Sequence, residues 1–117
     1  MTTGDQLGAA VHRLVGQVAH WTPSRWAASS AVPGRSRAEA FHGTLQTLAD
    51  AAATAEGAPP RPVPRLDNDL ALPDQLRVLA ADLARHAPRA VPAAVEAVTA
   101  LRDALRPTSG GPAGPGG

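Results

Sequence analysis

The stretch that decides the fold is RLDNDLALPDQLRVLAADLARH, residues 65–86. It begins as an acidic turn and continues with leucines that recur four, three and four residues apart, a spacing that places them on one face of a helix. These leucines are Leu72, Leu76, Leu79 and Leu83. Pro73 suits the first helical turn, where its missing N–H breaks no hydrogen bond, and Asp74 suits the positive end of the helix dipole. We therefore predict a helix with Leu76 and Leu79 at the centre of the core.

Three other long segments carry apolar residues at helical spacing, and we expect them to pack on this leucine stripe. The first covers residues 5–21, with a stripe that runs from Leu7 to Trp21. The second covers residues 36–56, where Ser36 and Glu39 have the spacing of a capping box and Gly57 is a typical helix end. The last begins between Pro88 and Pro92 and ends before Pro107.

Shorter segments connect these helices. Thr22 followed by Pro23 is typical of a helix start and predicts a short helix from Pro23 to about Ser30. The linker APPRPVPR, residues 58–65, is dense in proline and should form an extended strap, long enough to cross from one end of a helical bundle to the other. Residues 107–117 carry no side chain that could anchor them, so we expect a disordered Pro/Gly-rich tail.

The composition favours helices over a sheet. Leu occurs 12 times, Val 9 times and Phe once in 117 residues, Ile and Tyr are absent, and much of the remaining apolar content is alanine. Alanine is the best helix former and leaves little side chain to bury. The sequence therefore predicts one all-α domain over residues 1–106, an antiparallel four-helix bundle with a short extra helix after the first.

The basic residues are all arginine, 11 in number, which together with the abundant Ala, Pro and Gly resembles the codon bias of a high-GC bacterial genome. A pI near 9.1 is weak evidence for a nucleic-acid partner, because 10 carboxylates are interspersed with the arginines. One alternative hypothesis is that the protein is a nucleic-acid-associated regulator, with an arginine face on the last two helices. That face would comprise Arg77, Arg85, Arg89, Arg102 and Arg106.

Several chemistries are excluded by missing residues. The absence of Cys excludes disulfides, zinc fingers, iron–sulfur ligation and thiol catalysis. The absence of Lys excludes a Walker A loop and Schiff-base chemistry, and no GxSxG motif is present. We predict no catalytic residue and no cofactor, and hence a protein that is not an enzyme.

No metal site is predicted either. The histidines, His12, His20, His42 and His86, form no close pair, and we interpret them as surface or capping residues. The acidic cluster Asp67–Asp74 lacks the central Gly and terminal Glu of a calcium-binding loop, so turn formation explains it better.

Membrane association is not expected. The N-terminus lacks the basic and apolar regions of a signal peptide, and no apolar run approaches the ~20 residues that span a bilayer. We expect a cytoplasmic protein.

The segment His20–Trp26 is the candidate interaction site. It brings together His20, Trp21, Arg25 and Trp26 in a chain whose other aromatic residue is Phe41. Trp and Arg are enriched at interface hot spots, and Trp26 lies outside the regular stripes, as an anchor for a partner would. The alternative is that both tryptophans fill the end of a slim core.

The leading hypothesis for function follows from these features. It is a non-catalytic helical protein–protein interaction module that forms a homodimer or binds a larger partner. A second alternative, beside the nucleic-acid regulator, is a bundle that binds a small ligand between its helices.

Overall fold

All regular secondary structure in residues 3–106, the part that the computed structural model describes, is helical. The α-helices are α1 (Thr3–Val18), α2 (Pro23–Ala27), α3 (Arg37–Glu56), α4 (Leu72–His86) and α5 (Val91–Ala104). Short 3₁₀ turns, Asp69–Ala71 and Pro88–Ala90, lead into α4 and α5. The prediction of an all-α protein is confirmed, whereas the predicted tail, residues 107–117, lies outside the described residues.

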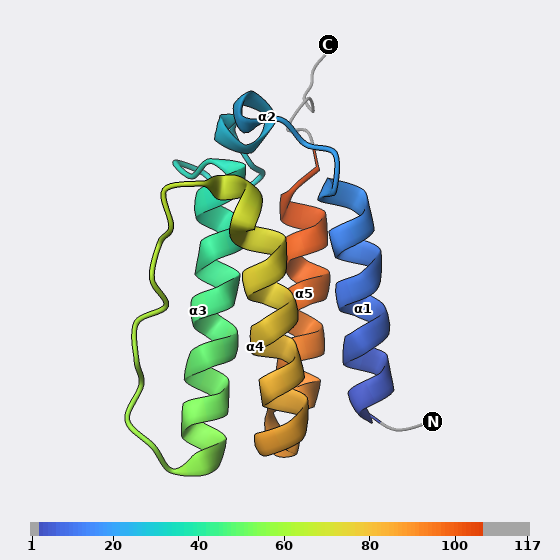
Figure 1. The fold of residues 1–117 in the computed structure, drawn as a ribbon, viewed down its shortest axis with the longest axis vertical. Helices are drawn as coiled ribbons and strands as arrows, with labels where there is room; N and C mark the ends of the chain where they lie inside the picture. The colour runs from blue at the N-terminus through green and yellow to red at the C-terminus, as the bar shows by residue number, and fades with distance from the viewer. Residues whose placement is uncertain (1–2, 107–117) are drawn as a thin grey trace.

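The four long helices pack side by side, and α2 lies across one end of them (Figure 1). Both α1 and α3 pack against α4 and against α5. In Figure 1, α1 and α5 run upward while α3 and α4 run downward. Each long helix therefore has one parallel and one antiparallel neighbour in this ring. The parallel pair of α3 and α4 exists because the strap, residues 58–65, returns the chain to the end where α3 began.

The helix ends follow local signals in the sequence. Ser36 and Glu39 form the predicted capping box: Ser36 N–H donates to Glu39 Oε1 (2.8 Å) and Glu39 N–H donates to Ser36 Oγ (3.1 Å). Gly57 ends α3 in the left-handed conformation, φ 70°, which favours glycine. Thr22 caps α2 by accepting from Arg25 N–H at 3.3 Å. By contrast α1 ends at Val18, short of the predicted Trp21.

The capping box predicts a pH dependence. The pKa of Glu39 is lowered, first because the Ser36 backbone N–H donates to its carboxylate and second through the Ser36 side chain. A carboxylate with a lowered folded-state pKa stabilises the fold above its ordinary pKa, about 4.3, and this stabilisation is lost as the pH falls through the lowered value. Glu39→Gln keeps an acceptor but cannot titrate. Thermal unfolding followed by circular dichroism should therefore show a smaller fall in Tm for this variant between about pH 5 and pH 3.

The control for this experiment is Glu96→Gln, which changes an exposed glutamate of α5 that caps no helix. Its Tm should fall with pH as that of the unaltered protein does. The same fall for Glu39→Gln as for the control would contradict a contribution from the Glu39 carboxylate.

The core runs along the bundle and is built mostly from leucine, valine and alanine. Leu72, Leu76 and Leu83 of α4 are buried as predicted. Leu79 is not at the centre of the core as predicted, because it is only half-buried and lies at the edge of α4 that faces the strap. The buried stripe passes through Ala80 instead, so the inward face of α4 is turned slightly away from the strap.

Candidate functional site

The tryptophans of the predicted interaction site belong to the core. Trp26 has no exposed surface, and Trp21 is 6% exposed. The Trp26 ring makes T-shaped contacts with the rings of Trp21 (centroids 4.9 Å apart) and Phe41 (5.3 Å). The prediction that Trp26 is an exposed anchor is therefore wrong, because α2 folds over the end of the bundle and buries this side chain. The alternative, that both tryptophans fill the end of a slim core, describes the structure.

Arginine side chains pack against the tryptophans at the same corner. Arg25 and His20 are exposed, and the Arg25 guanidinium lies 5.6 Å from the centroid of the Trp21 ring. Arg37, which sequence reasoning missed, lies 5.0 Å from the same ring and is only 8% exposed. Within residues 3–106 it forms no ion pair, and its Nη1 donates to the Arg25 carbonyl oxygen at 3.4 Å. The cation–π contact with Trp21 stabilises the buried charge of Arg37, as an ion pair with a carboxylate would otherwise do.

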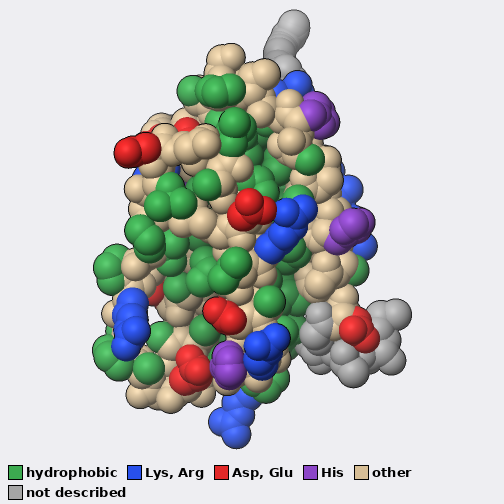
Figure 2. Space-filling model, in the orientation of Figure 1, with side chains coloured by type: hydrophobic (Ala, Val, Ile, Leu, Met, Phe, Trp, Pro, Cys, Tyr) green, Lys and Arg blue, Asp and Glu red, His purple; other side chains and the backbone are tan. Residues whose placement is uncertain are grey.

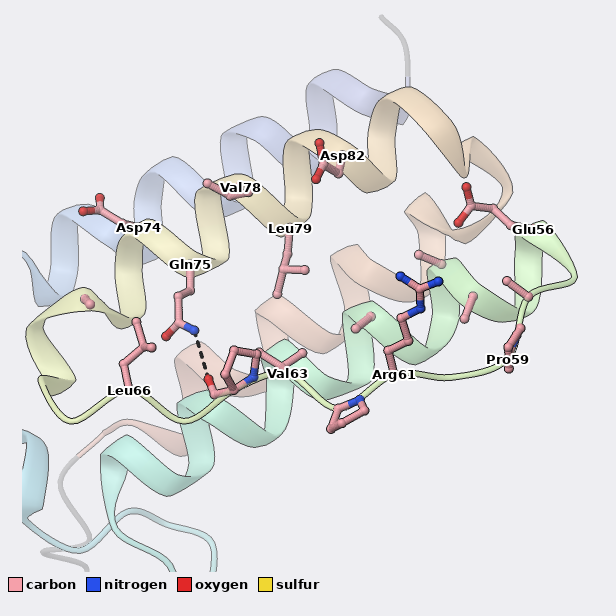
Figure 3. Close-up of a pocket in the computed structure, with 17 residues that line it drawn as sticks. Glu56, Pro59, Arg61, Val63, Leu66, Asp74, Gln75, Val78, Leu79 and Asp82 are labelled. Carbon is pink, nitrogen blue, oxygen red and sulfur yellow. Dashed lines mark hydrogen bonds between the residues drawn. The ribbon is translucent and has the colours of Figure 1, made fainter.

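A different feature of the surface is open to a partner. A groove of about 790 Å³ lies between the strap, the second half of α3 and the exposed edge of α4. Its α3 side is formed by small side chains, among them Ala49, Ala52 and Ala53. Opposite them, Leu79 of α4 points toward α3 and the strap (Figure 3). We call this feature the strap groove.

Polar side chains from α3 and α4 hold the strap in place. Val63 N–H donates to Gln46 Oε1 (2.8 Å), and Gln46 Nε2 donates to the Arg61 carbonyl oxygen (2.9 Å), so one amide side chain pairs with the strap backbone. His42 Nε2 donates to the Val63 carbonyl oxygen at 2.8 Å. From α4, Gln75 Nε2 donates to the Pro64 carbonyl oxygen at 3.1 Å. These contacts fix the strap at its middle and leave the groove open beside it.

The strap contacts make a testable prediction. Gln46→Ala should leave the half-buried Val63 N–H without its acceptor, at a cost of about 1–2 kcal/mol in unfolding free energy. Amide hydrogen exchange followed by NMR should show faster exchange of Val63 N–H in this variant. Gln6→Ala, at an exposed position of α1, should leave that exchange rate unchanged. Equal exchange rates in the two variants would contradict the role of Gln46.

One polar atom in the wall of the groove is unpaired. Gln75 Oε1 is buried and has no hydrogen-bond partner among the described residues. Its amide nitrogen is held by Pro64, so the oxygen cannot exchange places with it without breaking that bond. Buried acceptors normally have a donor, and leaving one without a donor costs free energy. Gln75 Oε1 is therefore an unpaired acceptor that lies beneath the surface of the groove wall.

The margin of the groove is acidic. Of the described residues, Glu56, Asp74 and Asp82 line it, and Arg61 is the one basic residue in the lining. Asp74 is paired with Arg77 (2.9 Å), but Glu56 and Asp82 form no ion pair within the described range. Figure 2 shows carboxylates on this face beside gathered apolar side chains, with arginine and histidine side chains next to them.

The predicted arginine face does not form one patch. Arg77 is paired with Asp74, and Arg106 lies 3.5 Å from Asp103. Because α4 and α5 run in opposite directions, Arg85 in the last turn of α4 and Arg102 in the last turn of α5 lie toward opposite ends of the bundle. A nucleic-acid surface requires clustered positive charge, which this arrangement does not favour.

The described part of the chain brings no three His, Asp or Glu side chains close enough together to bind a metal ion. None of its helices combines the length and hydropathy needed to cross a membrane. The comparisons with protein-family models, curated proteins and solved structures gave no match. The geometry of the strap groove is therefore the basis for the functional proposal.

Proposed function

We propose that the protein is a non-catalytic helical module that binds a protein partner through the strap groove. The observation that carries this proposal is an open, largely apolar groove between elements that are held rigidly by hydrogen bonds. Two of the large apolar side chains that remain exposed line it, Leu66 (43%) and Val78 (61%). Exposed apolar surface that is gathered in one place and rimmed by polar residues is typical of interaction sites.

The proposal also covers the location of the protein, its cofactors and the kind of partner. We propose that the module works in the cytoplasm, without a cofactor, and that its partner is another protein or a second copy of the chain. This differs from the expectation based on sequence in one respect, since the strap groove replaces the segment His20–Trp26 as the contact surface.

A small ligand is the second candidate occupant. The groove volume of about 790 Å³ falls in the usual range for ligand pockets, about 300–1,000 Å³. The partner protein is preferred because the groove is open along one side and its margin is charged.

The test is a comparison of matched baits. Ala49→Trp places a large ring on the floor of the groove, at a half-buried position, whereas Ala100→Trp makes the same change at an exposed position of α5 outside the groove. Both baits and the unaltered protein are incubated with lysate of the native organism, and bound proteins are quantified by mass spectrometry. A protein retained by the unaltered chain and by Ala100→Trp but lost with Ala49→Trp is expected. If all three baits retain the same proteins, the strap groove is not the contact surface.

A further inference from the structure

The margin of the strap groove carries charged side chains. Glu56 and Asp82 line it at the end where α3 finishes, both are exposed, and neither is paired with a cation in the part of the chain that the structure describes. Asp74 adds a third carboxylate at the opposite end of the groove, although Arg77 is already bound to it. In the groove lining that the structure describes, Arg61 is the basic residue, and His86 lines the adjoining hollow together with Glu56 and Asp82. Complementary charge steers association and selects partners, so the margin favours an occupant with basic flanks.

The backbone of the strap offers few groups to a peptide that would add a strand to it. Peptides that add a strand to a protein edge bind through backbone N–H and C=O groups. Pro59, Pro60, Pro62 and Pro64 have no N–H. The groups at the middle of the strap are already bonded, since Val63 N–H and the carbonyls of Arg61, Val63 and Pro64 pair with α3 and α4 side chains. Recognition must therefore come from side chains.

A helix satisfies this requirement. The alanines on the α3 side are small enough for another helix to approach closely, and apolar residues on one face of that helix would contact Val78, Leu79 and Leu66. This is the helix-in-groove mode, in which apolar anchors three and four residues apart enter the groove. Because α3 and α4 run parallel, an inserted helix can run antiparallel to both of them.

Residues 107–117 do not have the composition of such an occupant. Residues 107–117, PTSGGPAGPGG, contain no basic residue and no large apolar residue other than proline. A second copy offers few exposed large apolar residues outside the groove region among the residues that the structure describes. Leu66 and Val78 line the groove and Leu70 follows shortly after the strap, which leaves Val32. Two grooves placed face to face would also bring their acidic margins together.

We propose that the partner segment is an amphipathic helix with Lys or Arg at its flanks, an inference that rests on the proposed function of the strap groove. The spacing of the carboxylates sets the spacing of the cations. Asp74 and Asp82 are eight residues apart in α4, which corresponds to about 12 Å along the helix axis. The matching basic residues should therefore lie about two helical turns apart in the partner.

The experiment uses synthetic helices as probes. One fluorescently labelled peptide of about 18 residues carries leucine at helical spacing with lysine at the flanks, and the second has glutamate in place of each lysine. Fluorescence anisotropy measures the Kd of each peptide for the full chain. We expect the lysine helix to bind about tenfold or more tightly than the glutamate helix, with the difference shrinking as salt is raised. The small net charge of the chain, +1, argues against unspecific attraction of the lysine helix.

Two pairs of variants locate the binding. Glu56→Gln combined with Asp82→Asn should weaken the lysine helix about tenfold, whereas Glu96→Gln combined with Asp103→Asn removes the same charge from α5 and should change little. Ala49→Trp should abolish binding and Ala100→Trp should not. Circular dichroism checks that each variant is folded. Val78→Ser, at a 61% exposed position, is a second variant that should weaken binding, because it removes an apolar contact from the groove.

Each other outcome overturns the inference. Equal binding of both helices, blocked by Ala49→Trp, would leave the proposed function standing but exclude a basic partner. A dimer in analytical ultracentrifugation that Ala49→Trp dissociates would identify a second copy as the occupant. Binding of an apolar dye without either helix would identify a small ligand. If neither helix binds and all matched baits retain the same proteins, the proposed function fails as well.

Discussion

Trp26→Ala should lower the free energy of unfolding by about 3–5 kcal/mol, the usual cost of removing a large aromatic side chain from a core. The ring has no exposed surface and touches both Trp21 and Phe41, so its removal leaves a cavity lined by the other two aromatic residues of the described chain. Small domains are stable by about 5–15 kcal/mol, so a large share of the total would be lost. Urea unfolding followed by far-UV circular dichroism measures the change.

Two matched variants separate burial from other effects of this substitution. Trp26 Nε1 has no hydrogen-bond partner among the residues described, so Trp26→Phe loses no hydrogen bond and should cost clearly less than Trp26→Ala. Arg25→Ala, at the exposed neighbouring position, should change stability by only about 0.5 kcal/mol. A cost below about 1 kcal/mol for Trp26→Ala would place the ring on the surface. The segment His20–Trp26 would then again be the candidate interface.

The helices could be predicted because their signals are local. Ser36 and Glu39 interact across three residues, Gly57 directly follows α3, and Thr22 and Pro23 are adjacent at the start of α2. The apolar spacing of the long helices repeats often enough to identify one face of each. The strap was also predictable, since a proline-dense linker after Gly57 neither continues a helix nor pairs as a strand.

The burial of Trp26 depends on contacts that the local sequence does not encode. α2 has five residues, too few to show a periodic stripe. Its position across the end of the bundle depends on contacts with α3, beginning 10 residues after α2 ends. A tryptophan in such a segment suits a partner surface and a core equally well. Arg37 gave no signal either, because an arginine in the first turn of a helix is ordinarily exposed.

The strap groove also depends on contacts between residues that are far apart in the sequence. Gln46 meets the strap 15 and 17 residues further along the chain, and Gln75 meets it 11 residues back. In the sequence both glutamines have the pattern of polar residues on the outer face of a helix. The space between strap and helices depends on how far these side chains hold the backbone away from the alanines of α3, a distance that periodicity does not report.

Substitutions of Leu76 and Leu79 test whether the space between the strap and the helices is open. Their spacing makes them equal members of one stripe, but the structure separates them: Leu76 has no exposed surface, and Leu79 lines the strap groove. Leu76→Ala should cost about 2–5 kcal/mol, because it removes core contacts and leaves a cavity. Leu79→Ala should cost about 1 kcal/mol or less, because the groove is already open beside it.

Urea unfolding of both variants measures the difference, and Val78→Ala, at the adjacent exposed position, sets the baseline for a surface residue of α4. A large cost for Leu76→Ala with a small cost for Leu79→Ala would mean that the buried face of α4 includes Ala80 and not Leu79. Leu79 would then be available to a partner. Equal large costs would mean that the strap closes over Leu79 in solution. The groove would then be filled by the chain's own side chains, and a partner would have to displace the strap before it could bind.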